Sequence, residues 1–141
     1  MIQATPISGR QLSTTLTAMA HDFLAEWQRR FDRPGSSPCA SLQGETLILR
    51  MERALTPAEL ALTGRSGGDL AVGRQLESLL DDLYPWMAEQ VEARLHCFVA
   101  ESHVSLDLAD QSVTYRISLR DMPRVLIPAQ TESGCKEADR G

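Results

Sequence analysis

Histidine and cysteine are the residue types in this chain best suited to metal binding or nucleophilic chemistry. His96 and Cys97 are adjacent, His103 follows them, and Cys39 lies far away in the sequence. Adjacent residues of a strand point to opposite faces, so His96 and Cys97 would not meet at one ion without a bulge. The Ser102-His103 pair lacks an orienting acid and a nucleophile turn, and is weak evidence for hydrolase chemistry. We therefore predict no metal site, no cofactor and no catalytic residue.

The stretch "ALTPAEL", residues 54–60, has the spacing of a helix start. In a capping box the Thr56 hydroxyl would accept the Glu59 backbone N–H, and the Glu59 side chain would accept the Thr56 N–H. Pro57 fits the first helical position, where the missing N–H has no helical partner. The alternative is an anion or peptide site at the helix N-terminus, and Glu59 would repel an anion there. We interpret the motif as a structural cap.

Two other polar stretches have ordinary structural explanations. A phosphate-binding P-loop needs GxxxxGK[ST] after a strand, whereas "GRSGG" at 64–68 has no lysine and follows a helical pattern, which favours a turn or hinge. Carboxylates in acid–base catalysis face each other in a cleft. The acidic residues between 77 and 92 lie outside the apolar stripe of their helix, which indicates a solvated face: Glu77, Asp81, Asp82, Glu89 and Glu92.

The first half of the chain predicts a long helix followed by a hairpin. Apolar residues recur every three or four positions through 8–31, with Ser8 as a plausible cap, and the pattern stops at "DRPGSSP". Strands are predicted at 39–43 and 46–53. The second alternates apolar and polar residues, and Gly44-Glu45 supplies the turn.

The second half of the chain also predicts a long helix followed by a hairpin. A short helix begins at the "LTPAE" motif and ends at 64–68, and a second long helix runs from Asp69 to Leu95. Pro85 removes a backbone hydrogen bond, so we expect a kink near Tyr84 or two abutting helices. Strands follow at 97–108 and 112–119, around a turn at "ADQ".

This order of helix, hairpin, helix and hairpin predicts an α+β fold of two layers. An antiparallel sheet of about four strands would carry both long helices on one face. Residues 1–122 are expected to form a single domain and 123–141 a flexible tail. Phe98, Val99 and the "VLIP" run at 125–128 are expected to leave apolar surface that a second copy or a protein partner covers.

Charge and composition exclude several classes of partner. The net charge of −5 argues against nucleic acid and anionic membrane surfaces. No apolar run is long enough for membrane insertion, and the N-terminal stretch lacks the pattern of a signal peptide. Cys39, Cys97 and Cys135 are an odd, scattered set, which does not indicate a disulfide framework. A cytoplasmic location is expected.

Residues 10–119 resemble the MpsC-type domain, a bacterial domain of unknown function. The resemblance rests on Leu55, Thr56, Pro57, Ala58 and Glu59 after an alternating strand, on Gly68, on a long helix with an internal proline, and on a histidine turn at His103. The founding member is encoded with membrane proteins of a sodium-translocating, membrane-potential-generating system connected to inorganic-carbon supply. The resemblance carries no catalytic residues across.

The chain also departs from the family pattern at three places. It has Asp32-Arg33-Pro34-Gly35 where the family has Gly-Arg-Gly-Pro, His96 where a glycine closes the long helix, and Ser105 where an aspartate follows the histidine. The resemblance implies a non-enzymatic accessory or interaction domain that docks on an inner-membrane ion-translocating complex. The alternative is a small-molecule sensor with a pocket near His103 and the Pro85 kink. An enzyme is the third hypothesis.

Overall fold

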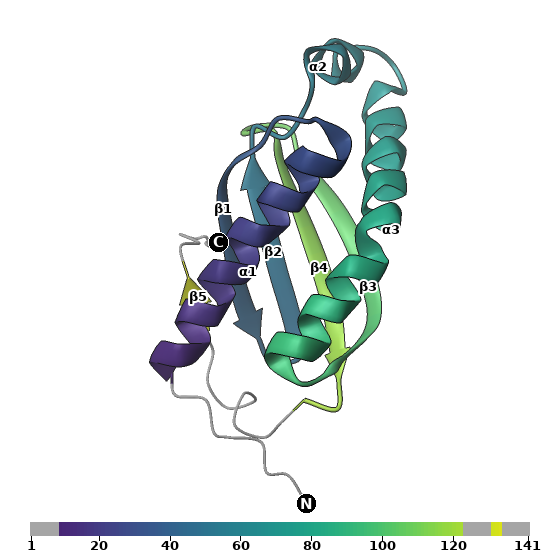
Figure 1. Cartoon of the computed structure of the whole chain (residues 1–141). Helices are drawn as coiled ribbons and strands as arrows, with labels where there is room; N and C mark the ends of the chain where they lie inside the picture. Colours follow the sequence, from purple (N-terminus) through teal and green to yellow (C-terminus); the bar gives the residue numbers. More distant parts are fainter. Residues whose placement is uncertain (1–8, 123–130, 134–141) are drawn as a thin grey trace, which may run out of the picture.

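The computed structural model describes residues 9–122 and 131–133 (Figure 1). Its elements are, in chain order, α1 (Gly9–Phe31), β1 (Ser36–Gln43), β2 (Thr46–Glu52), α2 (Pro57–Thr63), α3 (Gly68–Leu95), β3 (Phe98–Asp107), β4 (Ser112–Arg120) and β5 (Thr131–Ser133). The α+β class and the predicted order of helices and strands are confirmed. The short strand β5 was not predicted. The Ser8 cap, the "VLIP" run and most of the predicted tail lie outside the described residues.

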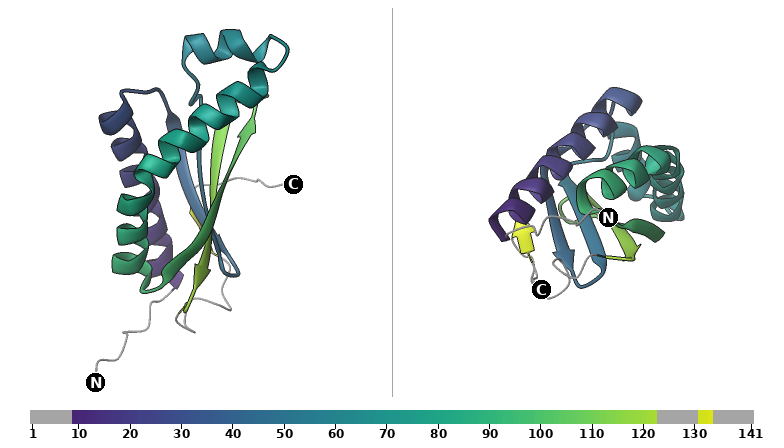
Figure 2. Two further views of the ribbon diagram at one scale, coloured as in Figure 1. Left: turned by 90° about the vertical axis from the view of Figure 1, so that its right-hand side faces the viewer. Right: turned by 60° about the horizontal axis from the view of Figure 1, so that its bottom comes forward.

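The strands form one antiparallel sheet in the order β3-β4-β2-β1-β5. Both long helices lie on the same face of it, α1 over β1 and β5 and α3 over β3 (Figures 1 and 2). This two-layer arrangement is the predicted one. The second hairpin pairs with the first through β4 and β2, which places these two strands at the centre of the sheet.

The core fills the space between the sheet and the helices. Leu47, Leu49 and Met51 on β2 are fully buried, as their alternation predicts. From α1, Phe23 stacks on Tyr115 of β4 with ring centroids 6.0 Å apart. Burial raises the pKa of Tyr115, against a smaller lowering by a hydrogen bond with Ser102.

The helix α3 runs through Pro85 as one element of 28 residues. Its axis changes direction along its length, which is clearest in the left view of Figure 2. A proline inside a helix removes one backbone hydrogen bond and crowds the preceding turn. Of the two expected outcomes, a bent helix rather than two abutting helices is therefore found.

The outer face of the sheet, on the side away from the two long helices, is largely polar. Alternation turns these residues of the three strands β2, β4 and β3 outward: Thr46, Ile48, Arg50, Glu52, Thr114, Arg116, Ser118, Arg120, His103 and Ser105. Phe98 is 43% exposed, as expected, but the Arg120 guanidinium lies 6.0 Å from its ring centroid. Val99, which was expected to leave apolar surface for a partner, does not lie on this face. It pairs with Leu119 and packs, half-buried, against the core.

Within the described part of the chain, no helix is long and apolar enough to cross a membrane.

The expectation that the cysteines form no disulfide framework is corrected at Cys39, which is disulfide-bonded. Cysteine spacing alone does not show which side chains the fold brings together.

Candidate functional site

The "LTPAE" motif forms the first turn of α2, and the predicted capping box is present. The Glu59 N–H donates to Thr56 Oγ1 at 3.2 Å, and the Thr56 N–H donates to Glu59 Oε1 at 3.0 Å. Pro57 occupies the first helical position. Leu55, just before the cap, is buried in the core. The motif thus fixes the point where the chain leaves the sheet and starts α2.

Glu59 has a second partner that the sequence did not suggest. The Arg33 guanidinium pairs with Glu59 Oε1, and both side chains are more than nine-tenths buried. Arg33 also donates to the Ala54 carbonyl at 3.2 Å and lies 5.1 Å from the centre of the Trp27 ring. Its Nε is buried with no hydrogen-bond partner among the described residues. Arg33 therefore joins the end of α1 to the start of α2.

Gly68 explains how α2 and α3 meet. A Cβ at this position would lie 1.6 Å from the Leu62 carbonyl oxygen, so only glycine allows the two helices to approach so closely. Gly67 before it has φ +77°, a conformation that glycine adopts readily. The glycine run is thus a tight corner between two helices, as predicted, and it resembles no phosphate cradle.

The α2 corner is the projecting end of the molecule (Figures 1 and 2). We use this name for Leu60 and Leu62 of α2 together with Leu70 at the start of α3. Their exposed fractions are 37%, 41% and 61%, and Glu59 is the one buried residue of α2. A helix that buries its glutamate and exposes its leucines has the reverse of the usual pattern.

The remaining motif residue, His103, lies elsewhere. It is exposed in the middle of the edge strand β3, opposite Arg116, so the expected histidine turn is wrong. The hairpin turn follows at Ala109 to Gln111, as predicted. The structure therefore brings Thr56, Pro57, Glu59 and Gly68 to one corner and leaves His103 out.

The side chains considered for metal or nucleophilic chemistry do not assemble. Cys97 is fully buried, and this burial raises the pKa of its thiol to about 11, so it is protonated at neutral pH. His96 ends α3 in the left-handed conformation, and His103 is exposed on the sheet. Across residues 9–122 and 131–133, no three His, Cys, Asp or Glu side chains gather closely enough to hold a metal ion.

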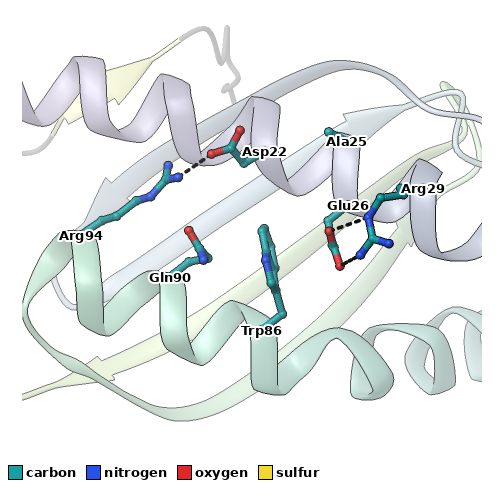
Figure 3. A pocket seen from close by; sticks show the side chains of 7 residues that line it. All are labelled: Asp22, Ala25, Glu26, Arg29, Trp86, Gln90 and Arg94. Carbon is teal, nitrogen blue, oxygen red and sulfur yellow. Dashed lines mark hydrogen bonds and ion pairs between the residues drawn. The ribbon is translucent and has the colours of Figure 1, made fainter.

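A groove between α1 and α3 is the second candidate site (Figure 3). Its volume is about 300 Å³, at the lower end of the range of ligand pockets. The lining residues are Asp22, Ala25, Glu26 and Arg29 from α1 and Trp86, Gln90 and Arg94 from α3. At one end, Arg94 Nη2 donates to Asp22 Oδ2 at 2.5 Å.

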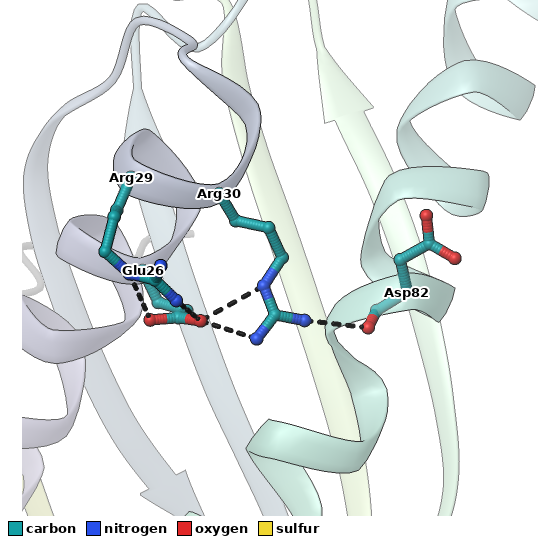
Figure 4. Close-up of polar contacts among 4 residues, drawn as sticks. All are labelled: Glu26, Arg29, Arg30 and Asp82. Carbon is teal, nitrogen blue, oxygen red and sulfur yellow. Dashed lines mark hydrogen bonds and ion pairs between the residues drawn. The ribbon is translucent and has the colours of Figure 1, made fainter.

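At the other end, Glu26 gathers two arginines (Figure 4). Arg29 donates to its two oxygens at 3.2 and 2.6 Å, and Arg30 donates twice to Oε2 at 3.0 and 2.6 Å. Hydrogen bonds from Arg29 lower the pKa of Glu26, burial opposes them, and Arg30 adds to the lowering. Arg30 also donates to the Asp82 carbonyl at 3.1 Å, which ties α1 to α3.

The sequence contained a signal for one half of this groove. The spacing of Glu26, Arg29 and Arg30 is that of neighbours on a helix surface. The pairing of Asp22 with Arg94, 72 positions apart, has no such signal. The groove also does not include His103, near which a pocket was expected, although Trp86 directly follows Pro85.

Comparisons of the chain with protein-family models, with curated proteins and with solved structures find no match.

Proposed function

We propose that this chain is a cytoplasmic, non-enzymatic accessory domain of the MpsC type, which docks on a protein of an inner-membrane ion-translocating or inorganic-carbon-supply complex. The resemblance described above motivates the class of partner. The observation that carries the proposal is the α2 corner, where a fixed helix presents leucines to solvent.

The energetics of α2 support a docking role. A helix of seven residues is unstable by itself, and the one buried side chain of α2 is that of a glutamate, Glu59. It is held instead by the capping box, by the buried Arg33–Glu59 pair and by the close approach at Gly68. We take these exposed leucines as the surface that contacts the partner. Partner binding at α2 would bury them at little conformational cost.

The test is membrane association in cells of the native organism. Tagged chain is compared with the double variant Leu60→Asp/Leu62→Asp, and the control is Leu108→Asp, because Leu108 is also 41% exposed but lies in the β3–β4 turn. We expect the chain to fractionate with an integral membrane protein, the α2 variant to lose this partner, and the control to keep it. No membrane association, or equal retention by the α2 variant, would contradict docking through α2.

A second candidate function, small-molecule sensing, is favoured by the groove between α1 and α3. A ligand present at one hundred times its Kd stabilises the folded state by about 2.7 kcal/mol. Thermal melting in the presence of metabolites and anions tests this candidate, and unchanged melting temperatures across the set would count against it.

A further inference from the structure

The charged side chains that line the groove between α1 and α3 balance one another. The guanidinium groups of Arg29 and Arg94 accompany the carboxylates of Asp22 and Glu26, and Arg30, which does not line the groove, adds a second arginine to Glu26. The chain as a whole carries a net charge of −5, so this balanced groove is less acidic than the chain as a whole.

The arginines also keep hydrogen-bond donors for a ligand. Within the described residues, Arg94 donates to Asp22 through Nη2 alone, and Arg29 donates to Glu26 through Nε and Nη2. Arg94 therefore has Nε and Nη1 available, and Arg29 has Nη1. Because guanidinium groups bind carboxylates with charge-assisted hydrogen bonds, these donors suit an organic acid.

The middle of the groove carries the flat indole ring of Trp86 beside the polar side chain of Gln90. Trp86 and Gln90 lie between the Asp22–Arg94 pair and the Glu26–Arg29 pair, and the Trp86 ring points into the groove (Figure 3). Ala25 adds a small side chain from α1, which leaves room beside the indole. A flat apolar group can pack there against Trp86.

We infer that the groove binds a small organic carboxylate with a planar apolar body. The carboxylate is held by Arg94 at one end of the groove, and the body packs against Trp86 in the middle. The inference rests on the second candidate function and gives it a ligand class. It is independent of docking at the α2 corner, because none of the groove residues belongs to that corner.

The experiment is a titration of the ¹⁵N-labelled full chain with benzoate, followed by NMR. The chain has two tryptophans, so it has two indole N–H signals. Trp27 is fully buried and donates to the Pro34 carbonyl at 3.1 Å, so its signal is an internal reference. We expect a saturable shift of the Trp86 signal with benzoate, and a much smaller response to benzamide and benzylammonium.

Three substitutions separate recognition from folding. Arg94→Gln should weaken benzoate binding about tenfold, as expected for the loss of a charged hydrogen bond. Asp22→Asn should strengthen binding, because it removes the carboxylate that competes for Arg94. Arg74→Gln, on an exposed part of the same helix, should leave the affinity unchanged.

Opposite effects of Arg94→Gln and Asp22→Asn would not arise from a merely structural ion pair, because either change breaks that pair. The inference is overturned by no shift of the Trp86 signal, by equal affinity for benzoate and benzamide, or by loss of binding in the Asp22→Asn variant. Equal affinity for inorganic phosphate would also overturn it, since phosphate has no planar body to pack on Trp86.

Discussion

Glu59 combines two roles that are usually separate. One carboxylate oxygen accepts the Thr56 N–H and also pairs with Arg33, so the helix cap and the buried ion pair share an atom. A capping box by itself is a surface feature and contributes about 1 kcal/mol. Burial beside Arg33 makes this glutamate far less replaceable, because without it a guanidinium would remain buried and uncompensated.

Replacing Glu59 by Gln tests that argument. The amide oxygen can still accept the Thr56 N–H, so most of the loss comes from the unpaired Arg33 charge. We expect the free energy of unfolding to fall by about 3 kcal/mol, as for other broken buried pairs. Urea denaturation of the original chain and of the variant measures this fall.

The control for this substitution is Glu89→Gln, which makes the same change at an exposed site of α3. It should alter the stability by less than about 0.5 kcal/mol. An equally small effect of Glu59→Gln would show that the buried pair is unimportant. The variant Arg33→Met/Glu59→Gln should recover part of the loss, because it removes the stranded charge.

Glu26 predicts how stability depends on pH. Its pKa in the folded chain is lowered from the usual 4.5, chiefly by hydrogen bonds from Arg29. The unfolded chain therefore takes up the proton first as the pH falls. The stabilisation that ionised Glu26 gives the folded chain is complete above pH 4.5. It is lost as the pH falls toward the pKa of Glu26 in the folded chain.

Urea denaturation at a series of pH values between about 7 and 3 measures this loss. Glu26→Gln should make the decline shallower, whereas the exposed control Glu89→Gln should not. Some decline should remain in the Glu26→Gln variant. Burial raises the pKa of Asp110, but hydrogen bonds from Ser112 and the charge of Arg50 outweigh this effect and lower that pKa as well. A pH profile unchanged by Glu26→Gln would contradict the assignment.

At the scale of elements, local pattern predicted most of the fold. The long helices follow from apolar spacing, the central strands from alternation, and the start of α2 from its cap. All these signals lie within a few residues of one another. Strand β5 has three residues, too few for an alternation signal, and it is defined by pairing with β1 far earlier in the chain.

The candidate sites were harder to predict for the same reason. Thr56 and Glu59 are three positions apart, and their contact was predicted. Arg33 meets Glu59 across 26 positions, and Arg94 meets Asp22 across 72. Such pairs depend on how the helices sit on the sheet, which no single segment encodes. His103 was grouped with the motif by resemblance alone, and the structure places it on a separate element.

The end of α3 offers a prediction for one element. His96 closes this helix with φ 59°, in the left-handed region where glycine is favoured, and its N–H donates to the Glu92 carbonyl at 3.1 Å. His96→Gly should relieve the backbone strain and so raise the free energy of unfolding. The greater flexibility of glycine in the unfolded chain offsets part of this gain, which leaves an increase of up to about 1 kcal/mol. Thermal denaturation measures the change, and His96→Ala, which keeps the strain, is the matched control. A loss of stability in the glycine variant would show that the imidazole matters more than the backbone.

At the scale of the whole molecule, stability is expected to be uneven. The strands β2 and β4 lie at the centre of the sheet, and their inward side chains are buried under both helices. The α2 corner is held by polar contacts and exposes its leucines. Local opening needs least free energy where few apolar contacts are lost. The helix proposed to dock is thus also the element expected to open first.

Hydrogen exchange followed by NMR tests this distribution. Amides of β2 and β4 should exchange only through global unfolding, so their protection should follow the stability measured with urea. Amides of α2 should exchange through a smaller opening that leaves the sheet intact. Glu59→Gln should remove most of the remaining protection in α2, because it weakens the contacts that hold this helix. Equal protection of α2 and the central strands would instead mean that the corner and the sheet unfold as one cooperative unit.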